Sequence, residues 1–208
     1  MLARSNGGRS RGTAIVILAL LLGSAFLVAI APHYMKEGYS WRANAISESA
    51  AQGLTHAWIA RAGLLSFGFA VVGLASSSRG VWSRSAVFLH TVFGICMTAA
   101  AAFSHRPWIS GVDYDAVEDL LHSIAATGMG FAFALGVLVR LAGRPPGSRA
   151  RKSFDVVAIA AATLLPLAMV EQDVAAGILQ RFMFAIAYVW YAIEAASLLS
   201  RLDTRVVV

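Results

Sequence analysis

Six long stretches of this chain consist mainly of apolar residues, and short polar segments separate them. Each stretch is near or above the roughly 17–25 residues that a helix needs to cross a bilayer. They cover residues 13–31, 57–75, 85–103, 120–139, 154–170 and 174–199. None shows the alternation of apolar and polar residues that is typical of membrane barrel strands. Because only helices and closed barrels satisfy the backbone in lipid, the pattern predicts an all-α integral membrane protein, a six-transmembrane-helix bundle.

The first apolar stretch has a second interpretation, which is a secretory signal peptide. The residues Ala29-Ile30-Ala31 resemble a cleavage motif. However, Pro32 would follow the cut, and the apolar core is longer than the roughly 7–15 residues that are usual in a signal. We therefore expect a retained first helix.

Composition supports the membrane class. Of the 208 residues, 58% are hydrophobic and 13% are charged, whereas a soluble domain has about 25% charged residues. The formal net charge is +6, but the basic residues lie in short loops rather than in one continuous patch, so nucleic-acid binding is not expected. The single Cys96 excludes an intrachain disulfide and a cysteine-rich metal cluster. We expect one membrane domain, residues 1–208.

Lysine and arginine mark alternate ends of the expected helices. The N-terminus, the second loop, the fourth loop and the C-terminus are basic, whereas the third loop carries Asp113, Asp115, Glu118 and Asp119. Basic loops remain in the cytoplasm. We therefore expect a multi-pass protein of the bacterial cytoplasmic (inner) membrane with both termini on the cytoplasmic side. The fourth loop, residues 143–153, contains two prolines and is expected to link four helices to a final hairpin while contacting anionic lipid heads.

The sixth apolar stretch carries a charge that requires a partner. Arg181 falls about seven residues into this helix, or roughly 10 Å below its start. A charge in hydrocarbon costs about 2.5–3.5 kcal/mol on insertion scales, so it normally faces a protein interior or a wet cavity. Gln180, Arg181, Phe184, Tyr188 and Tyr191 share one broad helical face, and Trp190 points away from Arg181. This polar face is expected to point inward.

Two kinds of partner are open for Arg181. Glu48 or Asp113 would form a buried ion pair that fixes helix register. Alternatively, a ligand carboxylate or phosphate would suit the planar guanidinium group. The sequence leaves open whether Asp113 or Asp115 faces the core. Arg61, which lies one turn inside the second helix, is expected to extend to the membrane surface.

Several short motifs in this order resemble a known family. They are Tyr39-Ser40, Ile46-Ser47-Glu48, Leu121-His122, Gly177-Ile178-Leu179-Gln180-Arg181 and Trp190. Their order and spacing resemble the bacterial membrane proteins grouped as domain of unknown function 998. That family usually has Phe-Pro and then Asp after the third helix, whereas Phe103 is followed here by Ser104-His105. The resemblance implies a six-helix membrane protein with the family's polar signature at Ser47, Glu48, His122, Gln180 and Arg181, and it implies no activity.

The first functional hypothesis is an outward-facing polar pocket for a small anionic or lipid-like ligand. Arg181, Gln180 and His122 would bind the ligand, and Glu48 and Tyr188 belong to the same site. Membrane lipids are the other expected partners. No metal and no cofactor is expected, because the histidines lack the H-E-x-x-H spacing and Arg181 would repel a cation.

Two further hypotheses use the same residues differently. In an intramembrane hydrolase, Ser47 would be the nucleophile, His122 the base and Asp113 the acid that orients it, while Arg181 would stabilise an oxyanion. In a non-enzymatic assembly subunit, these residues would only hold helices together. The sequence does not decide among the three functions.

Overall fold

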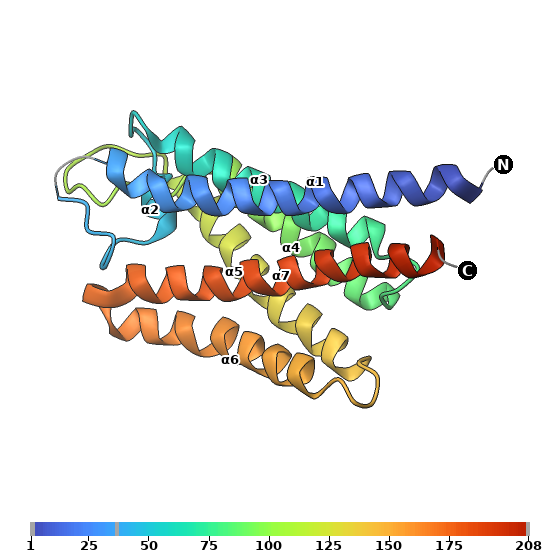
Figure 1. Ribbon diagram of the computed structural model, residues 1–208. Coiled ribbons are helices and arrows are strands. Elements are labelled where there is room, and N and C mark those ends of the chain that lie inside the picture. The colour runs from blue at the N-terminus through green and yellow to red at the C-terminus, as the bar shows by residue number, and fades with distance from the viewer. Residues whose placement is uncertain (1–2, 36–37, 207–208) are drawn as a thin grey trace.

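The fold is a bundle of long helices. The computed structural model describes residues 3–35 and 38–206, and this part of the chain contains no strand. The long helices are α1 (Ala3–Ile30), α3 (Ala57–Ser77), α4 (Arg84–Ala102), α5 (Ala116–Ala142), α6 (Arg149–Glu171) and α7 (Ala176–Val206) (Figure 1). The short elements are η1 (Ala31–Tyr34), α2 (Ile46–Ser49) and η2 (Asp173–Ala175). Six of the described helices are long and apolar enough to cross a membrane, which confirms the multi-pass, all-α prediction.

The connections distinguish two ends of the bundle. The segment from η1 to α3, the α4–α5 loop and η2 lie at one end, which we name the loop end. Both chain termini and the α3–α4 and α5–α6 loops lie at the opposite end, the termini end (Figure 1). Helix α5 begins four residues before the expected position 120, because the Asp115 side chain accepts hydrogen bonds from the N–H groups of Val117 and Glu118.

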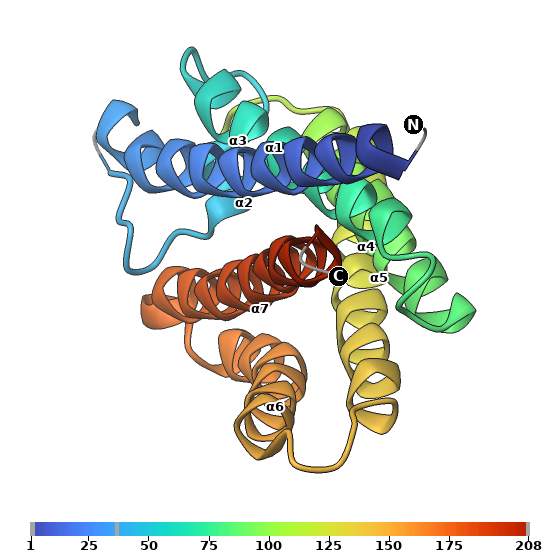
Figure 2. The ribbon, with the colours of Figure 1, turned by 45° about the vertical axis from the view of Figure 1, so that its right-hand side comes forward.

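The long helices pack as a closed ring in the order α1, α3, α4, α5, α6, α7 and back to α1. Figure 2 shows α7 between α1 and α6. The final hairpin is therefore integrated on both sides, because α6 packs on α5 and α7 packs on α1.

Aromatic side chains fill the centre of this ring. Phe67 of α3 is fully buried; it stacks on Tyr188 of α7 with ring centroids 4.2 Å apart and meets Tyr191 edge-on. Trp190 is also buried, 1% exposed, although the helical wheel places it opposite Arg181. The faces of α7 that carry Arg181 and Trp190 both contact other parts of the chain, since α1 and α6 pack on this helix.

Small residues allow two close contacts between helices. A Cβ atom on Gly94 of α4 would lie 2.8 Å from the carbonyl oxygen of Gly68 on α3, so these backbones touch. A Cβ atom on Gly136 of α5 would lie 2.8 Å from the ring of His90. Gly130, one helical turn and a half away, has nothing within 4 Å of such an atom, so it takes no part in close packing.

Candidate functional site

A segment at the loop end, residues 38–51, lies against the start of α7, and we name it the strap. The N–H of Gly177 donates to the carbonyl of Ala43, and the N–H of Ile178 donates to the carbonyl of Arg42, each at 3.0 Å. The first N–H groups of a helix have no acceptor within the helix. The strap backbone therefore supplies acceptors that the N-terminus of α7 requires.

The guanidinium of Arg181 holds the same segment from below. Its Nη1 donates to the carbonyls of Trp41 (2.7 Å) and Asn44 (2.8 Å), and to the Gly177 carbonyl of its own helix (3.0 Å). Its Nη2 donates to the hydroxyl of Tyr39 at 2.7 Å. All four acceptors are neutral, so the charge of Arg181 is stabilised by dipoles.

The alternative of a buried ion pair between Arg181 and Glu48 or Asp113 is wrong for the residues that the structure describes. The carboxylate of Glu48 instead accepts hydrogen bonds from the N–H of Ala45 (2.5 Å) and from the side-chain amide of Asn44 (3.0 Å). Asp113 is exposed in the α4–α5 loop. Glu48 is committed to the turn that begins α2, because it satisfies donors there.

Gln180 and Gly177 complete the contact between α7 and the strap. The side-chain oxygen of Gln180 accepts a hydrogen bond from the N–H of Ile46 at 2.5 Å. A Cβ atom on Gly177 would lie 2.7 Å from the Trp41 carbonyl oxygen and 2.9 Å from Arg181 Nη1, and it would also collide with the Asn44 carbonyl oxygen. Glycine at this position allows the backbones to approach.

A second arginine holds the far end of the strap. Arg61 of α3 donates from Nε to the Ala50 carbonyl (2.9 Å) and from Nη2 to the Ala51 carbonyl (3.1 Å). Arg61 is half-buried and binds carbonyls that the end of α2 leaves without helical partners, while its extension to the membrane surface stays a prediction. Ala50 and Ala51 are fully buried, so this end of the strap packs into the bundle.

A pocket of about 460 Å³ lies beside Arg181 at the loop end, with Ala29, Pro32, His33, Tyr39, Trp41 and Arg181 in its wall. Burial raises the pKa of the Tyr39 phenol above its ordinary value, although Arg181 acts in the opposite direction. The phenol is consequently neutral at pH 7, and it donates to the Ala45 carbonyl at 3.2 Å. The wall thus combines a cation with aromatic and apolar surface.

Tyr188, another expected ligand-binding residue, lies deeper between α7 and α1. Its hydroxyl is 2.6 Å from Ser24 Oγ, and Ser24 Oγ donates to the Gly63 carbonyl at 2.6 Å. Since the single proton of Ser24 is used for that carbonyl, Tyr188 donates to Ser24. The hydroxyl of Tyr188 joins α7 to α1 and α3, and Tyr188 is not among the residues of the pocket wall.

His122 is buried beneath the end of α4. Its Nδ1 is 2.9 Å from the carbonyl oxygens of Ala100 and Phe103, so Nδ1 carries the proton. Its ring meets the ring of His105 edge-on at 5.4 Å. Within the described part of the chain, no group of three or more histidine, cysteine or acidic side chains is arranged to hold a metal.

The residues of the hydrolase hypothesis come from three different places. Ser47 lies in α2, His122 in α5 and Asp113 in the exposed loop before α5. Among the described residues no hydrogen bond joins any two of these three side chains, and His122 is bonded to the carbonyls of Ala100 and Phe103 instead. Their catalytic roles stay a prediction.

Comparison with known proteins addresses the family of the chain. A family model described as a protein of unknown function (DUF998) matches residues 17–197. The chain belongs to the DUF998 family. Comparisons with curated proteins and with solved structures found no match. The family match includes the strap and the Arg181 region, and it confirms the resemblance drawn from the short motifs without assigning an activity.

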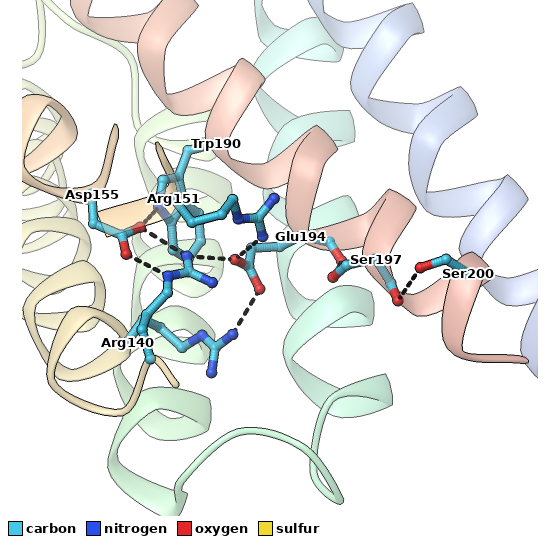
Figure 3. Close-up of polar contacts among 8 residues, drawn as sticks. Arg140, Arg151, Asp155, Trp190, Glu194, Ser197 and Ser200 are labelled. Carbon is cyan, nitrogen blue, oxygen red and sulfur yellow. Dashed lines mark hydrogen bonds and ion pairs between the residues drawn. The ribbon is translucent and has the colours of Figure 1, made fainter. Parts of the chain in front are cut away.

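The DUF998 protein has a second polar centre, at the termini end, which we name the arginine cluster: Arg140, Arg144, Arg151, Asp155 and Glu194 (Figure 3). Glu194 accepts a hydrogen bond from Arg144 of the fourth loop at 2.7 Å. Sequence reasoning missed Asp155. Its signal was an acidic residue at the very start of an apolar stretch that follows a basic loop.

Hydrogen bonds fix the cluster against the aromatic core. Arg144 donates to both oxygens of Asp155, at 2.5 and 2.8 Å, and these bonds raise the pKa of Arg144 above its ordinary value although burial lowers it. Trp190 Nε1 donates to Asp155 at 2.8 Å. Next to it, His90 stacks on Trp190 and its Nδ1 is 2.9 Å from the Tyr191 hydroxyl.

Proposed function

We propose that this DUF998 protein lies in the bacterial inner membrane with both termini in the cytoplasm, and that it binds an anionic, lipid-like ligand in the pocket beside Arg181. The orientation rests on the basic loops at the termini end, which contain Arg79, Arg84, Arg144 and Arg149. The loop end, and with it the pocket, then faces outward.

The observation that carries the proposal is the state of Arg181. It lines the pocket, and its hydrogen-bond acceptors are neutral carbonyls and a neutral phenol. Within the described residues its Nε makes no hydrogen bond, so the guanidinium keeps its charge and an N–H donor for an added acceptor. Arginine with spare donors is suited to phosphate or carboxylate.

The remaining wall favours a ligand that is partly apolar. Ala29 lies in the last turn of α1 and Pro32 in η1, near the level at which a membrane helix emerges from lipid, and Trp41 is 55% exposed. Tryptophan is enriched at this interface because its ring is amphipathic. A phospholipid head group with its first acyl carbons satisfies both halves of the wall.

The experiment is a thermal-shift titration with short-chain phosphatidylglycerol, and short-chain phosphatidylcholine, whose zwitterionic head group has no net charge, serves as the comparison. A ligand at about 100 times its Kd stabilises a protein by about 2.7 kcal/mol, so the wild-type Tm should rise with phosphatidylglycerol. Trp41→Ala should reduce the rise while leaving the fold intact, because Trp41 holds Arg181 through its backbone carbonyl. Arg181→Gln should abolish it.

Arg61→Gln is the matched control, because Arg61 also donates to strap carbonyls but is absent from the pocket wall. It should lower the Tm of the unliganded protein and keep the phosphatidylglycerol-induced rise. Equal rises in wild type, Trp41→Ala and Arg181→Gln would refute the proposed pocket.

A further inference from the structure

The arginine cluster at the termini end brings side chains from three segments to one carboxylate. Arg140 comes from α5, Arg144 from the α5–α6 loop and Arg151 from α6, and each donates to Glu194 of α7 at 2.6–2.9 Å. Glu194 and Asp155 are 2% and 1% exposed. Figure 3 shows the guanidinium groups of Arg140 and Arg151 directed at the Glu194 carboxylate.

Acceptors are scarcer than donors in this cluster. Glu194 Oε1 already accepts from Arg144 and Arg151, and Oε2 accepts from Arg140. Both oxygens of Asp155 are also used, by Arg144 and Trp190. By contrast, Arg140 Nε is buried without any hydrogen-bond partner within the described residues. A buried donor without a partner costs free energy, so an added acceptor would be favourable.

The net charge of the cluster also favours an added anion. Three arginines face two carboxylates, which leaves one positive charge in excess, and the exposed Arg149 and the half-buried Lys152 lie beside them on α6. Arg140 also lies over the ring of Trp82 at 4.9 Å, a contact that favours a cation but does not neutralise it. Within the described side chains of the termini end, Asp155 and Glu194 are the acidic residues.

Two arginines of the cluster are partly exposed, and they lie at helix ends, where lipid head groups are expected. Arg151 is 30% exposed and Arg140 is 13% exposed. Arg140 lies two residues before the end of α5 and Arg151 two residues after the start of α6. Helix ends of a multi-pass protein lie at the level of lipid head groups, where basic pockets between helices bind anionic phospholipids.

We propose that the arginine cluster is a second, separate binding site, which takes the phosphate of an anionic phospholipid in the leaflet at the termini end. A phosphodiester oxygen accepts hydrogen bonds from Arg151 and Arg140, and the lipid charge neutralises the excess positive charge. This site does not depend on the pocket beside Arg181, because the two lie at opposite ends of the bundle (Figure 1).

The test compares the protein in phosphatidylcholine nanodiscs with and without phosphatidylglycerol, by Tm and by native mass spectrometry of retained lipid. Wild type should have a higher Tm with phosphatidylglycerol and retain one lipid tightly. Arg151→Gln should bind it roughly tenfold less tightly, because a charge-assisted hydrogen bond is lost. Arg84→Gln removes an exposed arginine at the same end and should lose only the weaker, nonspecific surface attraction.

Three outcomes would overturn the proposal. Equal loss of phosphatidylglycerol in Arg151→Gln and Arg84→Gln would mean surface attraction alone. A Tm rise from inorganic phosphate in phosphatidylcholine nanodiscs as large as that from phosphatidylglycerol would assign the site to a free anion. Loss of retained lipid in Trp41→Ala, but not in Arg151→Gln, would place the lipid in the loop-end pocket.

Discussion

Glu194→Gln is expected to lower the free energy of unfolding by about 3–5 kcal/mol, the usual cost of removing one partner from a buried ion pair. Three arginines donate to this carboxylate, which is 2% exposed. A neutral amide cannot balance the charges of the three arginines. Its NH₂ group would also face the arginine N–H groups, which are donors and cannot accept its hydrogen bonds. Since α5, α6 and α7 meet at this residue, the final hairpin should separate from α5 first.

Thermal unfolding in detergent micelles, together with hydrogen exchange of residues 140–155, would measure this loss. Glu171→Gln is the matched control, because Glu171 is an exposed acid at the opposite end of α6. Its Tm should equal that of wild type. A Glu194→Gln protein with wild-type Tm and unchanged exchange would show that the arginines find other acceptors.

Gly177→Ala is expected to release the strap from α7. The added methyl group would meet the carbonyl oxygens of Trp41 and Asn44 and the guanidinium of Arg181, and overpacking of this kind costs about 1–3 kcal/mol. The exposed Arg42 lies in the strap and its carbonyl accepts from Ile178. Trypsin should therefore cleave after Arg42 faster in the variant than in wild type.

The control for this experiment is Gly23→Ala, because nothing lies within 4 Å of a Cβ atom at Gly23. It should leave the cleavage rate unchanged and the helix slightly more stable. Slow cleavage at Arg42 in Gly177→Ala, equal to wild type, would mean that the strap is held without the close approach at Gly177.

The bundle could be predicted from the sequence because its cause is local. Six apolar stretches of sufficient length each form one helix, and the even number places both termini at one end. For Glu194 the sequence shows an acid near a basic helix end, which allows either extension to the membrane surface or pairing with a loop arginine, and the structure shows the pairing.

The partners of Arg181 could not be predicted in the same way. A search for a carboxylate considers side chains, whereas Arg181 binds carbonyl groups of Trp41, Asn44 and Gly177. Every residue has a carbonyl, so the sequence contains no specific signal for these acceptors. The fold decides which carbonyls lack helical partners, and that requires the path of the strap.

The strap is attached to α7 through its backbone carbonyls, so its side chains are not needed for the attachment. Trp41, Arg42 and Ala43 contribute carbonyl oxygens to α7, and any amino acid offers the same oxygen at those positions. Side chains there can be exchanged without loss of the anchor, while Trp41 forms part of the pocket wall. Under the proposed function, single substitutions in the strap would therefore alter ligand preference without altering the bundle beneath it.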